Sequence, residues 1–116
     1  MTTVTFPWPA AALSQNGRHH WRQRASATKK ARRDAFWLCG EAGLRDLGAV
    51  EIAMRFTFHP PDKRRRDVAN AIGACKAMID GIADATGCDD SRFRIAWPDR
   101  FAEVQPHGAV VVEFGE

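Results

Sequence analysis

The clearest pattern in the chain is the alternation of apolar and polar residues in "AVEIAMRFTFH". Its apolar residues fall on one face of an extended chain and its polar residues on the other, as expected for a strand with one buried face. The "PPD" that follows cannot continue a strand and ends it. The apolar face of this predicted strand consists of Val50, Ile52, Met54, Phe56 and Phe58.

Three shorter segments also predict strands. Thr2–Phe6 is rich in β-branched and aromatic residues, and the "PWP" after it marks its end. Ser91–Trp97 alternates apolar and polar residues, and the valines of Ala109–Phe114 predict a closing strand. The chain therefore has enough strands for one small sheet.

Two segments have the spacing of helices. Ser26 or Thr28 can cap the first, which we expect to run as far as Leu44 and to end at a nearby glycine. The second covers Val68–Ala85, and its apolar residues recur every three or four positions, which places them on one buried stripe. That stripe consists of Val68, Ile72, Cys75, Ile79 and Ile82.

The order of these elements, β-α-β-α-β-β, predicts an α+β fold with two helices on a small mixed sheet. A length of 116 residues suits one domain, which we place at residues 1–116, and an apolar fraction of 45% is enough for a real core. We see no secretory signal and no apolar run near the roughly 18 residues of a membrane span. Three cysteines without metal spacing indicate reduced thiols, so we expect a cytoplasmic protein with no membrane partner.

The net charge is only +3, but most lysines and arginines fall in residues 18–33 and in the run Lys63–Arg66. A single charged run is more often a solvated surface. Two clusters, the first with His and Trp as well, favour a polyanion such as nucleic acid. In the first cluster, Trp21 either anchors its loop in the core or stacks on an unpaired base. The candidate DNA contacts from these clusters are Arg18, His19, His20, Arg22, Arg24, Lys63, Arg64, Arg65 and Arg66.

Asp67 stands directly after four cations, where a loop enters the second predicted helix. A carboxylate there can cap the helix by accepting backbone N–H bonds. Asp89 and Asp90 are adjacent acids that suit solvent or a bound cation. Mg²⁺ prefers oxygen ligands and is often held by one or two carboxylates with water and phosphate. Spacing alone leaves two readings open: a metal site for phosphodiester cleavage, or a helix cap and an exposed acidic turn.

Several motifs together resemble the RusA family of Holliday-junction resolvases, which are small phage and bacterial endonucleases. The first is "PDKRRRDVAN", which is similar to the family's basic run followed by D-x-D-N. A helix with Lys and Asp, "KAMIDGIADA", and a downstream "DD" follow in the family's order. The opening "FPWP" and "LSQNGRHHWRQRA" are similar as well, so the resemblance extends from Val4 to Ile95.

The resemblance implies roles for individual residues. Ala69 replaces the second acid of D-x-D-N, and Lys76 lies about one helical turn further from the motif than in the family. From spacing alone, Lys76 and Asp80 would be an ion pair four residues apart. The implied catalytic residues are Asp67, Asp90 and Lys76. The implied metal ligands are Asp67, Asp80, Asp89 and Asp90, and Asn70 is an implied DNA contact.

The family also implies an activity. We expect a Mg²⁺-dependent homodimer that cuts four-way DNA junctions symmetrically, in phage or prophage DNA recombination and repair. A non-enzymatic DNA-binding protein of the same fold, with its site weakened at Ala69, is the alternative.

Overall fold

The computed structural model describes residues 2–14, 20–48 and 50–115. In this part of the chain, four strands form one sheet in the order β1-β4-β2-β3. β4 pairs antiparallel with both β1 and β2, whereas β2 and β3 are parallel, so the sheet is mixed. The strands are β1 (Thr2–Phe6), β2 (Ile52–His59), β3 (Phe93–Ala96) and β4 (Ala109–Phe114). The predicted α+β class with a small mixed sheet is confirmed.

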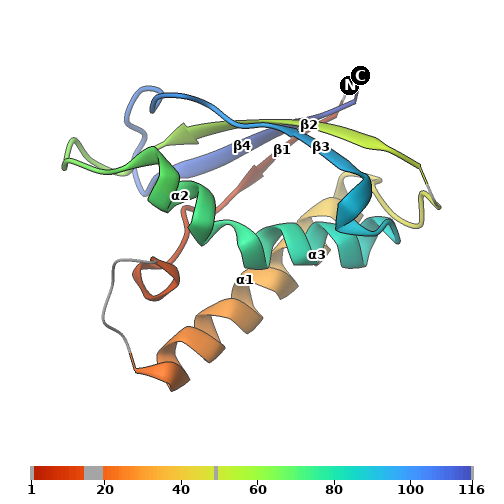
Figure 1. The fold of residues 1–116 in the computed structure, drawn as a ribbon, viewed down its shortest axis with the longest axis horizontal. Helices are drawn as coiled ribbons and strands as arrows, with labels where there is room; N and C mark the ends of the chain where they lie inside the picture. Colours follow the sequence, from red (N-terminus) through yellow and green to blue (C-terminus); the bar gives the residue numbers. More distant parts are fainter. Residues whose placement is uncertain (1, 15–19, 49, 116) are drawn as a thin grey trace.

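The helices lie together on one face of this sheet, and the other face carries none of them (Figure 1). Two of them, α1 and α3, pack against each other beneath the strands. No helix of the described residues is long and apolar enough to span a bilayer. The helices are α1 (Trp21–Glu41), α2 (Val68–Ala74) and α3 (Lys76–Thr86), with short 3-10 turns η1 (Ala11–Leu13) and η2 (Asp90–Arg92).

The apolar face predicted for β2 is the centre of the core. Its side chains from Ile52 to Phe58 alternate between buried and less buried positions, as the pattern predicts. Phe56 and Phe58 pack against the ring of Trp97, at centroid distances of 4.4 and 6.3 Å. Val50 does not join them, because the strand begins only at Ile52 and the Val50 side chain is exposed.

The first helix begins earlier than predicted. The expected start at Ser26 or Thr28 is wrong: α1 starts at Trp21, where the ring nitrogen Nδ1 of His20 accepts the backbone N–H of Arg22 at 3.1 Å. Its first turns are exposed, and its buried residues are Ala35 and Cys39 near the other end. Residues 21–25, which precede the expected start, therefore belong to a solvent-exposed stretch of helix.

The second predicted helix is two helices, α2 and α3, which meet at Cys75. The break changes which residues face inward. Cys75 and Ile82 are buried as predicted, but the other three members of the stripe are only half-buried. In their place α3 buries small residues and one methionine: Ala77, Met78, Gly81 and Ala85. Small residues let α3 approach α1 closely.

At Gly81 the two helices approach each other very closely. A Cβ atom there would lie 2.2 Å from the backbone oxygen of Arg32 and 2.8 Å from the Cβ of Ala35. Because the obstacle is backbone, Gly81→Ala should lower the free energy of unfolding by about 1–3 kcal/mol in urea denaturation. Gly40→Ala is the matched control, since its new Cβ meets only the movable side chain of Arg45. It should leave stability unchanged or raise it by up to about 1 kcal/mol. Equal stability of the two variants would contradict the close packing.

Candidate functional site

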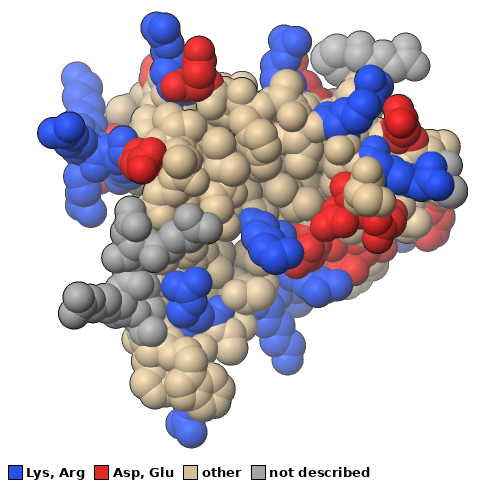
Figure 2. Space-filling view, viewed as in Figure 1, with Lys and Arg blue, Asp and Glu red and all other residues tan. Residues whose placement is uncertain are grey.

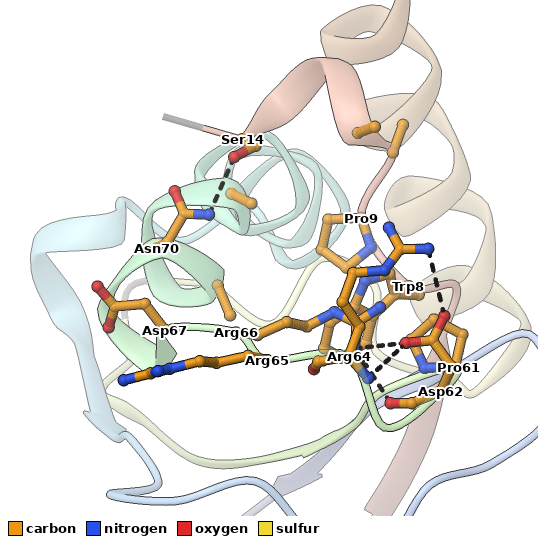
Figure 3. Close-up of a pocket in the computed structure, with 14 residues that line it drawn as sticks. Trp8, Pro9, Ser14, Pro61, Asp62, Arg64, Arg65, Arg66, Asp67 and Asn70 are labelled. Atoms are coloured by element: carbon orange, nitrogen blue, oxygen red, sulfur yellow. Dashed lines mark hydrogen bonds and ion pairs between the residues drawn. The ribbon is translucent and has the colours of Figure 1, made fainter. Parts of the chain in front are cut away.

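The largest pocket of the described residues lies between the segment after β1, the loop before α2, and α2 itself (Figure 3). Its volume is about 910 Å³. We call it the α2 pocket. Its polar lining comes from Ser14, Asp62, Arg64, Arg65, Arg66, Asp67 and Asn70, and the ring of Trp8 forms part of its wall.

Asp67 lies at the edge of the α2 pocket and caps α2. Its Oδ1 accepts the backbone N–H of Ala69 at 2.9 Å, so the predicted capping role is confirmed. The residue is nevertheless exposed. Figure 3 shows its carboxylate and the extended Arg65 side chain on the same side of the pocket. An exposed carboxylate beside arginines is an arrangement suited to a phosphate group and a cation bound together.

Asn70 connects α2 to the N-terminal segment. Its Nδ2 donates a hydrogen bond to the Oγ of Ser14 at 2.9 Å, and Arg24 of α1 donates to the backbone oxygen of Ser14 at 3.3 Å. Ser14 thus joins α1, α2 and the segment after β1 beside the α2 pocket. The candidates Arg18 and His19 lie outside the described residues.

The other candidate DNA contacts of the N-terminal cluster lie at the exposed start of α1. His20, Arg22 and Arg24 are all exposed. Trp21 is 66% exposed, with the His20 ring stacked at 5.6 Å and the Arg22 guanidinium 5.3 Å from its centroid. This excludes the reading in which Trp21 anchors a loop in the core. The first turn of α1 therefore presents an aromatic ring among basic side chains to solvent.

The downstream acids line a second hollow, at the far end of α3, and Figure 2 shows acidic side chains gathered on that part of the surface. We call it the acidic hollow. Its charged lining consists of Arg32, Asp80, Asp84, Asp89 and Asp90. The guanidinium of Arg32 holds Asp84 through two bonds of 2.6 and 2.8 Å and thereby lowers the pKa of that carboxyl. This pair fixes α1 to α3 and forms one wall of the hollow.

Asp89 and Asp90 have different surroundings. The carboxylate of Asp89 accepts hydrogen bonds from the hydroxyl and the backbone N–H of Ser91, and these bonds lower the pKa of Asp89. Asp89 is therefore the cap of η2. Asp90 is the first residue of η2 and is exposed. Of these two adjacent acids, the Asp89 carboxylate is hydrogen-bonded within the turn, whereas Asp90 is exposed to solvent at the acidic hollow.

Lys76 begins α3 and lies between the two hollows. Its Nζ is 3.9 Å from Oδ1 of Asp80, which is the ion pair expected from spacing alone. The lysine side chain is 80% exposed, so the pair is a loose surface contact. Such a lysine can move to a phosphate without leaving a buried charge behind.

The two acidic groups are well separated within one chain. Asp67 begins α2 and Asp90 follows the end of α3, and Figure 1 shows these helices one after the other along the sheet. At 1.5 Å per residue, α2 is roughly 10 Å long and α3 roughly 16 Å. Nowhere in the described ranges do three His, Cys, Asp or Glu side chains come close enough to hold one metal ion. Asp67 and the other carboxylates predicted to share one metal therefore line two different pockets of the chain.

Comparison with known proteins identifies the family, although no family model matches the chain. A protein of Xylella fastidiosa, itself uncharacterised, is 39% identical over 115 residues, which are 97% of this chain and 74% of the relative. The crossover junction endodeoxyribonuclease RusA of Escherichia coli K12 is 31% identical over 84 residues, which are 72% of this chain and 68% of the relative. The chain belongs to the RusA family. The RusA protein of Enterobacteria phage 82 is also 31% identical, over 83 residues.

The RusA motif positions are thus divided between the two hollows of this chain. Asp67 and Asn70 lie at the α2 pocket, and Asp89 and Asp90 lie at the acidic hollow. Ala69, which stands where the RusA motif has its second acid, is exposed on the first turn of α2. A carboxylate at position 69 would therefore displace no packed atoms, so its absence is not imposed by the fold.

Proposed function

We propose that this RusA-family chain is a Mg²⁺-dependent endonuclease that cuts branched DNA, four-way junctions in particular, as a homodimer. The observation that carries the proposal is the position of Asp67. In a chain related to crossover junction endodeoxyribonucleases, this exposed acid lies at a pocket that Arg64 and Arg65 also line. A basic pocket draws in the phosphate backbone, and a carboxylate within it can hold a cation against that phosphate.

The basic residues bind the backbone of DNA without reading its sequence. Lys63, Arg64 and Arg65 are exposed on the loop before α2, and the exposed start of α1 adds Arg22 and Arg24. Guanidinium and ammonium groups bind phosphate oxygens and release counterions from DNA, which makes affinity depend steeply on salt. This surface therefore selects a DNA shape, and a branched substrate offers more than one duplex arm to it.

The metal site is proposed to form between two copies. Carboxylates are the oxygen ligands that Mg²⁺ prefers, and they line both hollows, so the donor chemistry fits. If two α2–α3 segments lie antiparallel, Asp67 of one copy comes beside the partner's Asp90. When bound, Mg²⁺ supplies an activated water and neutralises charge on the phosphate. Asp80 and Asp89 line the same hollow as Asp90 and complete the proposed ligand set.

Other side chains prepare the substrate. Lys76 is exposed at the start of α3 and can place its ammonium group against a phosphate oxygen, where it stabilises developing negative charge. Asn70 keeps the N-terminal segment against α2 through Ser14, so the walls of the pocket are held in register. A homodimer with two-fold symmetry then presents two such sites to two strands, as symmetric cutting requires.

A cleavage assay tests the proposal. With Mg²⁺, the protein should introduce paired, symmetric nicks into a synthetic four-way junction, and EDTA should abolish them. Linear duplex of the same sequence should be cut far less. Light scattering should give about twice the 12.9 kDa mass of the chain. Junction binding without cutting at any Mg²⁺ concentration would instead support a non-enzymatic binding protein whose site is weakened at Ala69.

A further inference from the structure

Arg66 differs from the other cations of the loop before α2. Lys63, Arg64 and Arg65 are exposed, and the Arg64 side chain is 78% exposed. The Arg66 side chain is only 17% exposed. Four consecutive cations that look alike in sequence are therefore divided by the fold into three that face solvent and one that is turned inward.

The inward side chain binds its own loop. Nη1 of Arg66 lies 2.9 Å from Oδ1 of Asp62 and donates to the backbone oxygens of Asp62 at 3.0 Å and Arg64 at 3.1 Å. All three acceptors belong to the four residues that precede Arg66. A planar guanidinium that holds several acceptors fixes the path of the chain between them.

Asp62 holds the same loop from its other end. Its Oδ1 accepts a hydrogen bond from the backbone N–H of Arg64 at 2.9 Å and also contacts Nη1 of Arg66. The hydrogen bond from Arg66, followed by that from the Arg64 backbone, keeps the pKa of Asp62 below its ordinary value. These two residues therefore favour the charged form of the Asp62 carboxylate, although its charge alone would repel a phosphate group.

Trp8 connects this loop to the core. The Arg66 guanidinium lies 5.7 Å from the Trp8 ring centroid, within the range of a cation–π contact. Trp8 in turn packs on Phe58 and Phe101, with centroid distances of 6.2 and 6.3 Å. At Gly108, a Cβ would lie only 2.8 Å from the Trp8 Cβ, so the ring is closely confined from that side as well. The surface on which Arg66 rests does not move independently of the sheet.

We infer that Asp62, Arg66 and Trp8 form a clasp that positions Arg64 and Arg65 for the DNA backbone, and that Arg66 is a positioning residue and not a phosphate contact (Figure 3). This inference rests on the proposed function, because it assigns roles within the DNA-binding loop. It revises the simpler expectation that all four cations bind phosphate. It also changes the effect expected of Asp62 on DNA affinity. By its charge alone an acid near the DNA should weaken binding, whereas Asp62 strengthens binding because it holds the loop.

The first experiment compares Arg66→Lys with Arg100→Lys, two variants of identical charge; Arg100 is exposed on the bend after β3, outside both pockets. Arg100→Lys keeps the charge at a residue that has no role in the proposed site, so it should bind a four-way junction within about twofold of the parent protein. Lysine has no planar guanidinium that can lie over the Trp8 ring while its nitrogen holds the loop, so Arg66→Lys should lose one of these two contacts and bind about tenfold more weakly. Equal affinities of the two variants would overturn the clasp.

The second experiment compares Asp62→Asn with Asp99→Asn, an exposed acid on the bend after β3. Each raises the net charge by one, so simple electrostatics predicts tighter junction binding for both. The clasp predicts that Asp99→Asn binds as tightly as the parent or more so, and that Asp62→Asn binds more weakly. If Asp62→Asn binds more tightly as well, the inference is wrong.

Limited proteolysis with trypsin tests the clasp without DNA. Trypsin cuts after Lys and Arg, so residues 63–66 report directly on how well the loop is held. Cleavage there should be faster in Asp62→Asn and Arg66→Lys than in the parent, Asp99→Asn and Arg100→Lys, while thermal unfolding stays similar. If the parent fails to bind DNA but this order of cleavage rates holds, the proposed function fails and the clasp stands. If the cleavage rates are all equal, the clasp itself fails.

Discussion

Asp67→Asn and Asp90→Asn should each lower the rate of junction cleavage by about a hundredfold or more, while junction binding survives. Asparagine keeps the size of the side chain but removes the charge that holds a cation. In EDTA, each variant should bind a junction as tightly as the parent or slightly more so, because one carboxylate no longer repels the phosphates. Cleavage is measured on labelled junctions with Mg²⁺, and binding by fluorescence anisotropy without it.

The structure makes Asp67→Asn a clean test. Asp67 caps α2 through the N–H of Ala69, and Asn is as good a cap as Asp, so the helix should keep its start. A loss of activity would then report on charge and not on folding. Asp89→Asn should do less harm, because Asp89 is engaged with Ser91 in capping η2. If both Asp67→Asn and Asp90→Asn cut at the parent rate, Asp67 is only a cap and Asp90 only part of an exposed turn.

The sequence predicts the sheet well because strand periodicity reports directly on burial. In β2, every second side chain enters the core, so the alternation in the sequence and the burial in the structure coincide. The helices carry weaker signals. The first turns of α1 bury almost nothing, so they have no apolar face to detect, and a His20 ring nitrogen is an uncommon cap. The break at Cys75 is preceded only by Gly73, and one glycine inside a helical pattern is often tolerated.

The candidate site is predicted from sequence only where its residues are neighbours in the chain. The cap at Asp67 and the acids at positions 89 and 90 are visible as local patterns. The contacts that organise them join distant segments: Asn70 with Ser14, and Arg66 with Trp8. No spacing rule connects such pairs, because they depend on how the elements pack. For the same reason, nothing in the run of four cations distinguishes Arg66 from Arg65.

The separation of Asp67 from Asp90 leads to the second prediction, which concerns cleavage by mixed dimers. If each site combines Asp67 of one chain with the partner's Asp90, a mixture of the two inactive variants should recover cleavage. A mixed dimer would have one site with both acids replaced and one site with both acids intact. After random exchange of subunits, about half of the dimers are mixed, and each keeps one active site of two.

The product of this mixture distinguishes the two arrangements. A mixed dimer with one active site should nick a single strand of the junction, whereas the parent dimer should cut two strands symmetrically. The mixture is made by co-expression with two different tags, and the doubly tagged dimer is purified before the assay. If each site is instead built from one chain, both sites of the mixed dimer lack an acid, and it should be as inactive as either variant alone. Asp67 and Asp90 lie at opposite ends of the α2–α3 segment. To bring them together within one chain, the two helices would have to fold back on each other and leave their places beneath the sheet. We therefore expect the mixed dimer to recover cleavage.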